Sequence, residues 1–225
     1  MGYKKSEITN RLNGINNLED LYVEKMVNYT GNTTDTKEKY TEVIAKEILD
    51  NPNKYNFNDI NIIKRDKGYK IDTHDGKYNE KSPRREEIIA MKLFYTTHDG
   101  LGEFIDYQIP LKDKKNTKAG KIDLISYCEE KNTLYLIELK NDFSKETLLR
   151  CVLEIMTYIN QVDKEKLVVD YNMESNVKIK PAILIFEGTR PYKDISDKYV
   201  TELIKKFGIA LYIANIDEKF NIKSI

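Results

Sequence analysis

Apolar residues recur at helical spacing in two stretches near the start of the chain, residues 8–27 and 40–49. The polar, turn-rich segment 31–35 separates these two stretches. We therefore expect residues 1–80 to form a partly helical N-terminal extension with its linker, and residues 82–225 to form the main core.

A polar connection leads into this core. Residues 64–85 contain few aliphatic side chains, which predicts a linker or an exposed hairpin. Ser82 and Pro83 then offer an N-cap followed by a proline at the first helical position. The acids Glu86 and Glu87 come next, in the first turn, where the helix dipole favours negative charge. This pattern predicts that a helix begins here.

The core alternates helical and strand-like segments. Three apolar runs predict a meander of antiparallel strands, and a broad apolar stripe at helical spacing follows them. A continuous apolar run after Pro181 is typical of a strand buried on both faces. We expect an α/β (α+β) fold with a mixed central sheet and the order α, β, β, β, α, β, α, β over residues 82–97, 103–111, 121–128, 133–140, 145–162, 182–186, 194–207 and 208–216.

Composition excludes several classes of protein. The chain balances 37 Lys and Arg against 37 Asp and Glu. Its mean hydropathy is -0.61, and it has no apolar run near the roughly 18 to 20 residues that cross a bilayer. The first residues lack the apolar core of a secretory signal, so we expect a cytoplasmic protein with no membrane partner. Cys128 and Cys151 lie in apolar segments without metal-site spacing, which predicts buried thiols.

The candidate chemistry lies in the second and third predicted strands. An acid-x-Lys tripeptide occurs six times, and five of these look like solvated surface. Glu138 and Lys140 differ because they follow the apolar run of residues 134–137, which is expected to be an interior strand. The two-residue period of a strand places both side chains on one face. Asp123 lies in the preceding apolar strand, and a hairpin turning at residues 129–132 would set it beside Glu138. Two adjacent carboxylates repel each other, and a divalent cation such as Mg²⁺, which prefers oxygen ligands, relieves that repulsion.

At these residues the sequence resembles the PD-(D/E)xK phosphodiesterase superfamily, which includes many restriction enzymes, Holliday-junction resolvases and recombination exonucleases. The matching text is Gly120-Lys121-Ile122-Asp123 followed by Ile137-Glu138-Leu139-Lys140. The predicted αβββαβ order over residues 82–216 is also similar to that family. Ile122 stands where the family has proline.

The resemblance implies a restriction-endonuclease-like core and a nuclease that cleaves DNA with Mg²⁺ or Mn²⁺. It implies that Asp123, Glu138 and the carbonyl of Leu139 hold the metal. Lys140 would orient the attacking water or help to deprotonate it. The family's first helix commonly adds a glutamate at the metal, and Glu86 or Glu87 could take that role. Glu86 is preferred because it is in phase with the apolar face of that helix, whereas simple dipole stabilisation is the alternative.

The helix after the motif also resembles the family. Some members carry Gln-x-x-x-Tyr there, and Glu154 to Tyr158 gives the same spacing with Glu in place of Gln. Arg150 shares the face of Glu154 and Tyr158, which makes Arg150 and Tyr158 candidate nucleic-acid contacts. The alternative is that Arg150 and Glu154 form only a helix ion pair.

Local basic segments predict where DNA approaches. Residues 64–85 contain eight basic and four acidic residues, and residues 112–121 contain five basic residues and one acidic residue. We expect Lys114, Lys115 and Lys118 of the second segment to contact phosphates, although solvated charge without a partner is the alternative.

Three other interpretations stay open. Asp123, Glu138 and Lys140 could form a purely structural ion-pair network. The chain could be a non-catalytic nucleic-acid-binding or scaffold domain that keeps the nuclease fold. A carboxylate-pair glycosidase would also need two acids, but it has no use for the nearby lysine. His74 and His98 lie in turn sequences and are expected to be exposed loop residues. The sequence leaves the oligomeric state open, with a homodimer as one option.

Overall fold

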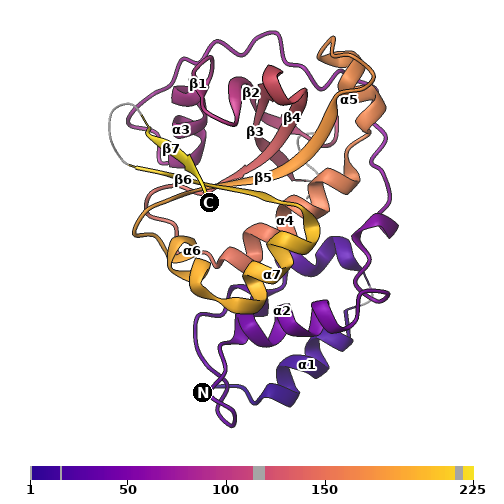
Figure 1. Cartoon of the computed structure of the whole chain (residues 1–225), viewed down its shortest axis with the longest axis vertical. Helices are drawn as coiled ribbons and strands as arrows, with labels where there is room; N and C mark the ends of the chain where they lie inside the picture. Colours follow the sequence, from indigo (N-terminus) through magenta and orange to yellow (C-terminus); the bar gives the residue numbers. More distant parts are fainter. Residues whose placement is uncertain (1, 16, 114–119, 216–219) are drawn as a thin grey trace.

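A mixed sheet with helices on both faces forms the centre of the computed structural model (Figure 1), which describes residues 2–15, 17–113, 120–215 and 220–225. Within these ranges the sheet has seven strands, and their spatial order equals their order in the sequence. The strands are β1 (Thr97–His98), β2 (Gly102–Pro110), β3 (Lys121–Cys128), β4 (Thr133–Leu139), β5 (Lys178–Phe186), β6 (Ala210–Ala214) and β7 (Ile222–Ser224).

Strand directions follow the expected mixed pattern. β1 to β4 pair antiparallel, β5 pairs parallel with β4, β6 pairs parallel with β5, and β7 returns antiparallel to β6. The mixed α/β class and the antiparallel meander of the first three predicted strands are therefore confirmed. A parallel neighbour of β4 requires a crossover, and α4 (Leu148–Gln161) and α5 (Lys164–Asp170) lie in that connection.

The helices form two layers around the sheet. α3 (Arg85–Leu93) lies on one side, whereas α4 and α7 (Lys198–Phe207) lie on the other (Figure 1). α1 (Lys5–Asn13) and α2 (Tyr40–Asp50) pack beyond α7 and α4, and α6 (Arg190–Lys193) follows β5. Short 3-10 helices complete the described secondary structure at Leu18–Val23, Lys25–Asn28, Phe57–Asp59, Glu129–Lys131 and Asp194–Ser196.

Apolar side chains pack in two clusters, one on each face of the sheet. The larger cluster joins the inner face of α4 to α7 and to the N-terminal helices. The smaller cluster joins α3 to the opposite face of β2 to β6. Cys128 and Cys151 are buried free thiols, as predicted. Among the described residues, no helix has the length and apolar character needed to cross a bilayer.

Several predicted helices differ from the structure in their bounds. α4 begins at Leu148 instead of residue 145, and α7 begins at Lys198 instead of residue 194. The first N-terminal stretch forms separate short helices, because α1 ends at Asn13 with Gly14 as its C-cap, and two 3-10 helices follow. α3 is shorter than the predicted helix over residues 82–97. Ser82 Oγ accepts a hydrogen bond from the Arg84 N–H at 3.2 Å in a turn before the helix. Tyr95 takes a positive φ of 62°, which a helix cannot continue through.

The expectation of exposed histidines is wrong for both. His74 Nδ1 lies 2.5 Å from Asp106 Oδ1, and its ring stacks on Tyr107 with centroids 4.0 Å apart. Asp106 also accepts a hydrogen bond from the Tyr171 hydroxyl at 2.6 Å. The polar connection before α3 is thus fastened to β2. His98 lies in β1, and burial lowers its pKa.

Candidate active site

The β3–β4 hairpin brings Asp123 to the Glu138–Lys140 segment. The turn forms where it was predicted, with Asn132 in the left-handed conformation at its end. The last pair of residues at the open end of the hairpin is Leu124 with Ile137. One residue further out, Asp123 Oδ2 accepts a hydrogen bond from the Leu139 N–H at 2.9 Å.

Asp123 is held by two donors and has a strongly shifted pKa. Its second oxygen, Oδ1, accepts a hydrogen bond from the side-chain amide of Gln108 at 3.0 Å. Burial raises the pKa of Asp123 to about 7, and the nearby carboxylates of Glu86 and Glu154 act in the same direction. Lys140 and the Leu139 hydrogen bond oppose this shift without cancelling it. A cation placed beside Asp123 would therefore stabilise its ionised form.

Lys140 is buried among carboxylates. Its Nζ lies 2.5 Å from Glu138, 2.9 Å from Glu146 and 3.4 Å from Glu154. Burial alone would lower the pKa of Lys140, but Glu138 and Glu154 outweigh that effect and raise it well above its usual value. Burial and the neighbouring Glu154 carboxylate raise the pKa of Glu138. Lys140 is accordingly a fixed positive charge at neutral pH.

One face of α4 supports this lysine. The helix begins after Thr147, whose hydroxyl accepts a hydrogen bond from the Arg150 N–H at 3.2 Å. Arg150 lies 3.0 Å from Glu146 and 3.9 Å from Glu154, so the helix ion pair considered above is present. Burial acts to raise the pKa of Glu154, but Lys140, a hydrogen bond from Tyr158 and Arg150 together lower it.

Tyr158 is buried behind Glu154. Its side chain is only 4% exposed, and its hydroxyl donates a hydrogen bond to Glu154 at 2.8 Å. The same hydroxyl lies 3.4 Å from the hydroxyl of Tyr22 in the N-terminal extension. The backbone of Gly120 packs so closely on the Tyr158 ring that a Cβ atom there would collide with it. Tyr158 therefore fixes the position of Glu154 in this structure.

Glu86 faces the site from α3. Its Oε1 accepts hydrogen bonds from the backbone N–H of Asn141 at 3.2 Å and from the Asn141 side chain at 2.9 Å. Glu86, Asn141, Gln108 and Asp123 line one pocket of about 330 Å³. Glu87 lines the same pocket, but its carboxylate pairs with Arg84 at 3.2 Å and with Lys121 at 3.4 Å. Glu86 is thus the acid of this helix that touches the residue after Lys140.

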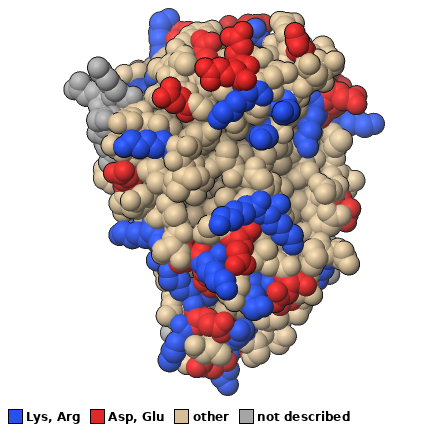
Figure 2. All heavy atoms as spheres, viewed as in Figure 1, with Lys and Arg blue, Asp and Glu red and all other residues tan. Residues whose placement is uncertain are grey.

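The predicted phosphate contacts Lys114, Lys115 and Lys118 lie outside the described residues. In the segment 64–85, Arg65 is buried and donates to backbone carbonyls, Pro110 among them. Arg85 forms a bidentate ion pair with Asp142. Figure 2 shows Lys and Arg interspersed with Asp and Glu over one face, with a mainly uncharged area near its middle. This face offers no extended basic surface.

Sequence reasoning missed three residues of the site, namely Gln108, Asn141 and Glu146. Asn141 directly follows the motif, and the four-residue spacing of Glu146, Arg150 and Glu154 in the sequence could have identified Glu146. Gln108 gave no local signal. It has a positive φ of 51° within β2, and it lies between residues that pair on either side of Asp123. Only the strand register reveals its proximity to Asp123.

The donor set suits a hard divalent cation. Asp123, Glu138 and the Leu139 carbonyl offer oxygen ligands of the type that Mg²⁺ and Mn²⁺ prefer. The raised pKa values of both carboxyls mean that positive charge beside them is favourable. Within the described parts of the chain, no three acidic, histidine or cysteine side chains already converge as ligands of one ion.

Comparison of this chain with protein-family models, with curated proteins and with solved structures finds no match.

Proposed function

We propose that this chain is a divalent-metal-dependent phosphodiesterase that cleaves DNA, as its resemblance to the PD-(D/E)xK superfamily implies. The observation that carries the proposal is the hydrogen bond from the Leu139 N–H to the Asp123 carboxylate. This bond holds Asp123 beside the Glu138-Leu139-Lys140 segment. The order of α3, β2, β3, β4, α4 and β5, with β5 parallel to β4, supports the expected αβββαβ core.

In this proposal Asp123, Glu138 and the carbonyl of Leu139 hold Mg²⁺ or Mn²⁺. The bound metal supplies a Lewis acid that offsets the charge building on the phosphate and on the leaving oxygen. Glu86 lines the same pocket as Asp123 and adds a further oxygen donor from α3. Asn141 fixes one oxygen of Glu86, so the other oxygen is left to face a ligand.

Lys140 acts as a positive point charge. Because neighbouring carboxylates raise its pKa, the ammonium keeps its protons at neutral pH and donates hydrogen bonds. It can therefore orient the attacking water or hold a phosphate oxygen, which favours positioning over proton abstraction. Glu146 and Glu154 hold Lys140 in place from the loop before α4 and from α4 itself.

One observation favours the non-catalytic alternative. Lys140 already has three carboxylate partners, so the ion-pair network is satisfied by the side chains of this chain alone. A nucleic-acid-binding or scaffold domain could keep such a network for its structure. The two candidate functions differ in whether the site turns DNA over.

A cleavage assay with a matched control tests the proposal. Purified protein is incubated with plasmid DNA, linear DNA and RNA in Mg²⁺, Mn²⁺ or EDTA. We expect DNA cleavage that EDTA abolishes and that Glu138→Gln lowers by at least about 10²-fold, the scale typical of lost electrostatic stabilisation. Glu129→Gln changes another acid-x-Lys tripeptide, on the exposed hairpin turn, and should leave the rate unchanged. Absence of cleavage, or full activity of Glu138→Gln, would overturn the proposal.

A further inference from the structure

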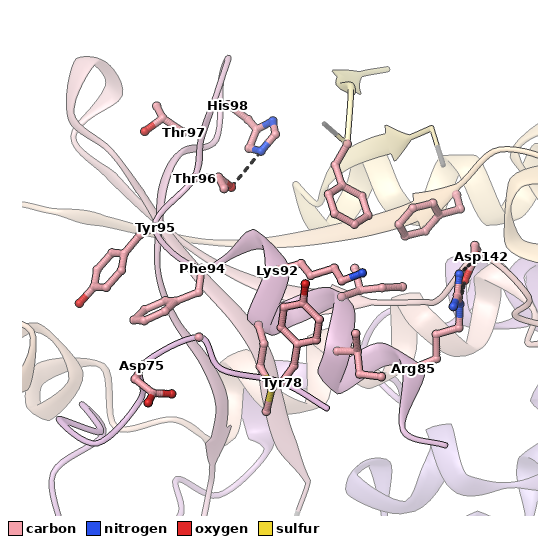
Figure 3. A pocket seen from close by; sticks show the side chains of 16 residues that line it. Asp75, Tyr78, Arg85, Lys92, Phe94, Tyr95, Thr96, Thr97, His98 and Asp142 are labelled. Carbon is pink, nitrogen blue, oxygen red and sulfur yellow. Dashed lines mark hydrogen bonds and ion pairs between the residues drawn. The ribbon is translucent and has the colours of Figure 1, made fainter. Parts of the chain in front are cut away.

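A second, larger pocket lies on the α3 side of the sheet. Its volume is about 870 Å³, within the range of ligand-binding cavities. The lining comes from α3, from the connections before and after it, and from Phe186 and Phe220. Figure 3 shows Phe94 and Tyr95 toward one end, the Arg85–Asp142 pair at the other end, and Lys92 between them.

Exposed aromatic rings form part of this lining. Phe94 and Tyr95 stack with ring centroids 3.8 Å apart, and Tyr95 is 68% exposed. Tyr78, from the connection before α3, is 41% exposed and lines the same pocket. Large aromatic side chains bury much apolar area when a flat partner covers them. These two tyrosines leave that area open to a ligand.

The backbone holds Tyr95 in an unusual conformation. Its φ is 62°, a value that residues other than glycine seldom adopt. Hydrogen bonds from the Tyr95 N–H to the Phe104 carbonyl at 2.8 Å and from the Thr96 N–H to the Leu93 carbonyl at 2.9 Å fix the turn. This conformation directs a large ring outward instead of into the core. Strained residues of this kind concentrate at functional sites.

Cations accompany the rings. Lys92 Nζ lies 4.9 Å from the centre of the Tyr78 ring, and its carboxylate contact is the exposed Glu80 at 3.4 Å. Arg85 lies over the ring of the exposed Phe143, with 5.0 Å between its guanidinium carbon and the ring centre. Proteins that bind single-stranded nucleic acid commonly combine aromatic rings with adjacent positive charges. The bases stack on the rings, and the phosphates pair with the cations.

The pocket borders the proposed catalytic site. Arg85 lines both pockets, and the residues next to Arg85 and Asp142 in the chain, Glu86 and Asn141, line the small pocket that contains Asp123. The Arg85–Asp142 ion pair therefore forms a shared wall. A DNA strand that passes Asp123 can continue over this wall toward Lys92 and Tyr95.

We propose that this pocket binds unpaired nucleotides of a single-stranded DNA segment, with bases stacked on Tyr95 and Tyr78 and a phosphate at Lys92. The inference rests on the proposed nuclease function and specifies its substrate. The preferred DNA then carries an unpaired segment next to the cleaved phosphate, as at a frayed end, a flap or a junction, and is not a continuous duplex.

Equilibrium binding tests this pocket without catalysis. Fluorescence anisotropy in EDTA, with Glu138→Gln as the parent, compares a labelled oligothymidine single strand with a blunt duplex. We expect tighter binding of the single strand. Tyr95→Ala and Tyr78→Ala should each weaken it roughly 5- to 150-fold, the cost of one stacked base. Tyr95→Phe keeps the ring and should bind like the parent. Val169→Ala changes an exposed apolar residue on α5 and serves as the control.

The outcomes separate this inference from the proposed function. Parent-like single-strand binding by Tyr95→Ala, equal losses on single strand and duplex, or failure of the parent to bind a single strand would each overturn the inference. DNA cleavage that depends on Glu138 would still stand in those cases. Tyr95-dependent binding of single strands by a protein that cleaves no DNA would instead support the pocket and refute the nuclease. Thermal melting of each variant verifies that the fold is retained.

Discussion

The carboxylate of Asp123 accepts a hydrogen bond from the backbone N–H of Leu139 at 2.9 Å. This bond links the open end of β3 to the residue between Glu138 and Lys140. The distance between Asp123 and Glu138 is therefore set by strand pairing in the buried sheet, not by a loop. Pairing of this kind provides the rigid support that a metal site requires.

Divalent metal should stabilise the folded protein through these acids. We expect saturating Mg²⁺ or Mn²⁺, at about 100 times the dissociation constant, to add about 2.7 kcal/mol to the free energy of unfolding. For a chain of this length each 1 kcal/mol shifts the melting temperature by roughly 2–4 °C, so the melting temperature should rise by roughly 5–11 °C. The Asp123→Asn, Glu138→Gln double variant should show no rise, whereas Glu129→Gln should respond like the wild type. Equal rises in the double variant and the wild type would place the metal elsewhere.

Without metal, stability should fall as the pH rises through the range in which Asp123 titrates. The folded protein keeps a proton on Asp123 up to a pKa of about 7, whereas the unfolded chain releases it near 3.8. The folded state therefore binds the extra proton between these values, and raising the pH removes that advantage. The loss amounts to at most ~4 kcal/mol between pH 4 and pH 8.

Urea unfolding in EDTA at several pH values measures this dependence. Asp123→Asn should flatten the decline, because the amide carries no proton to lose. Asp50→Asn, at the exposed end of α2, is the matched control and should keep the wild-type slope. Identical slopes for Asp123→Asn and the wild type would show that Asp123 titrates normally.

Removal of Lys140 should destabilise the fold. Lys140→Met leaves Glu138, Glu146 and Glu154 without their shared cation, and breaking a buried ion pair costs about 3–5 kcal/mol. Glu154→Gln should recover part of that loss in a double variant, because it removes one of the unpaired charges. Urea unfolding at pH 8 measures both effects, with Lys131→Met as the surface control. Strictly additive costs would mean that Lys140 and Glu154 do not interact.

Gly120 should tolerate no side chain. A Cβ atom at this position would collide with the buried ring of Tyr158, and overpacking of this kind costs about 1–3 kcal/mol. Gly14→Ala places its Cβ no closer than 3.5 Å to its neighbours and should change the free energy of unfolding by less than about 0.5 kcal/mol. Thermal melting of both variants is the measurement. A Gly120→Ala protein as stable as the wild type would contradict the close packing.

The elements that carry the candidate acids could be predicted from the sequence because their signals are local. The strand bearing Asp123 spans Lys121–Cys128 as predicted, and β4 ends one residue before the predicted Lys140. Apolar runs separated by a short charged turn determine such a hairpin with little help from the rest of the fold. The proximity of Asp123 to Glu138 followed from that hairpin alone.

The parts that could not be predicted depend on contacts distant in the sequence. Gln108 reaches Asp123 through the register of β2 on β3. The turn motif around His74 is indistinguishable from an exposed loop until Asp106 and Tyr171 are placed around it. The end of α3 is set by the hydrogen bond from Tyr95 to Phe104, not by residues within the helix.

The contact between Tyr22 and Tyr158 links the N-terminal part of the chain to the candidate site on the other side of α4. Tyr22 meets Tyr158, Tyr158 binds Glu154, and Glu154 holds Lys140. A fragment that begins at Ser82 would lose Tyr22, the first residue in this series of contacts. It would also expose the apolar surface that the N-terminal helices cover. A shortened protein that is meant to keep the candidate site intact therefore has to include the N-terminal helices.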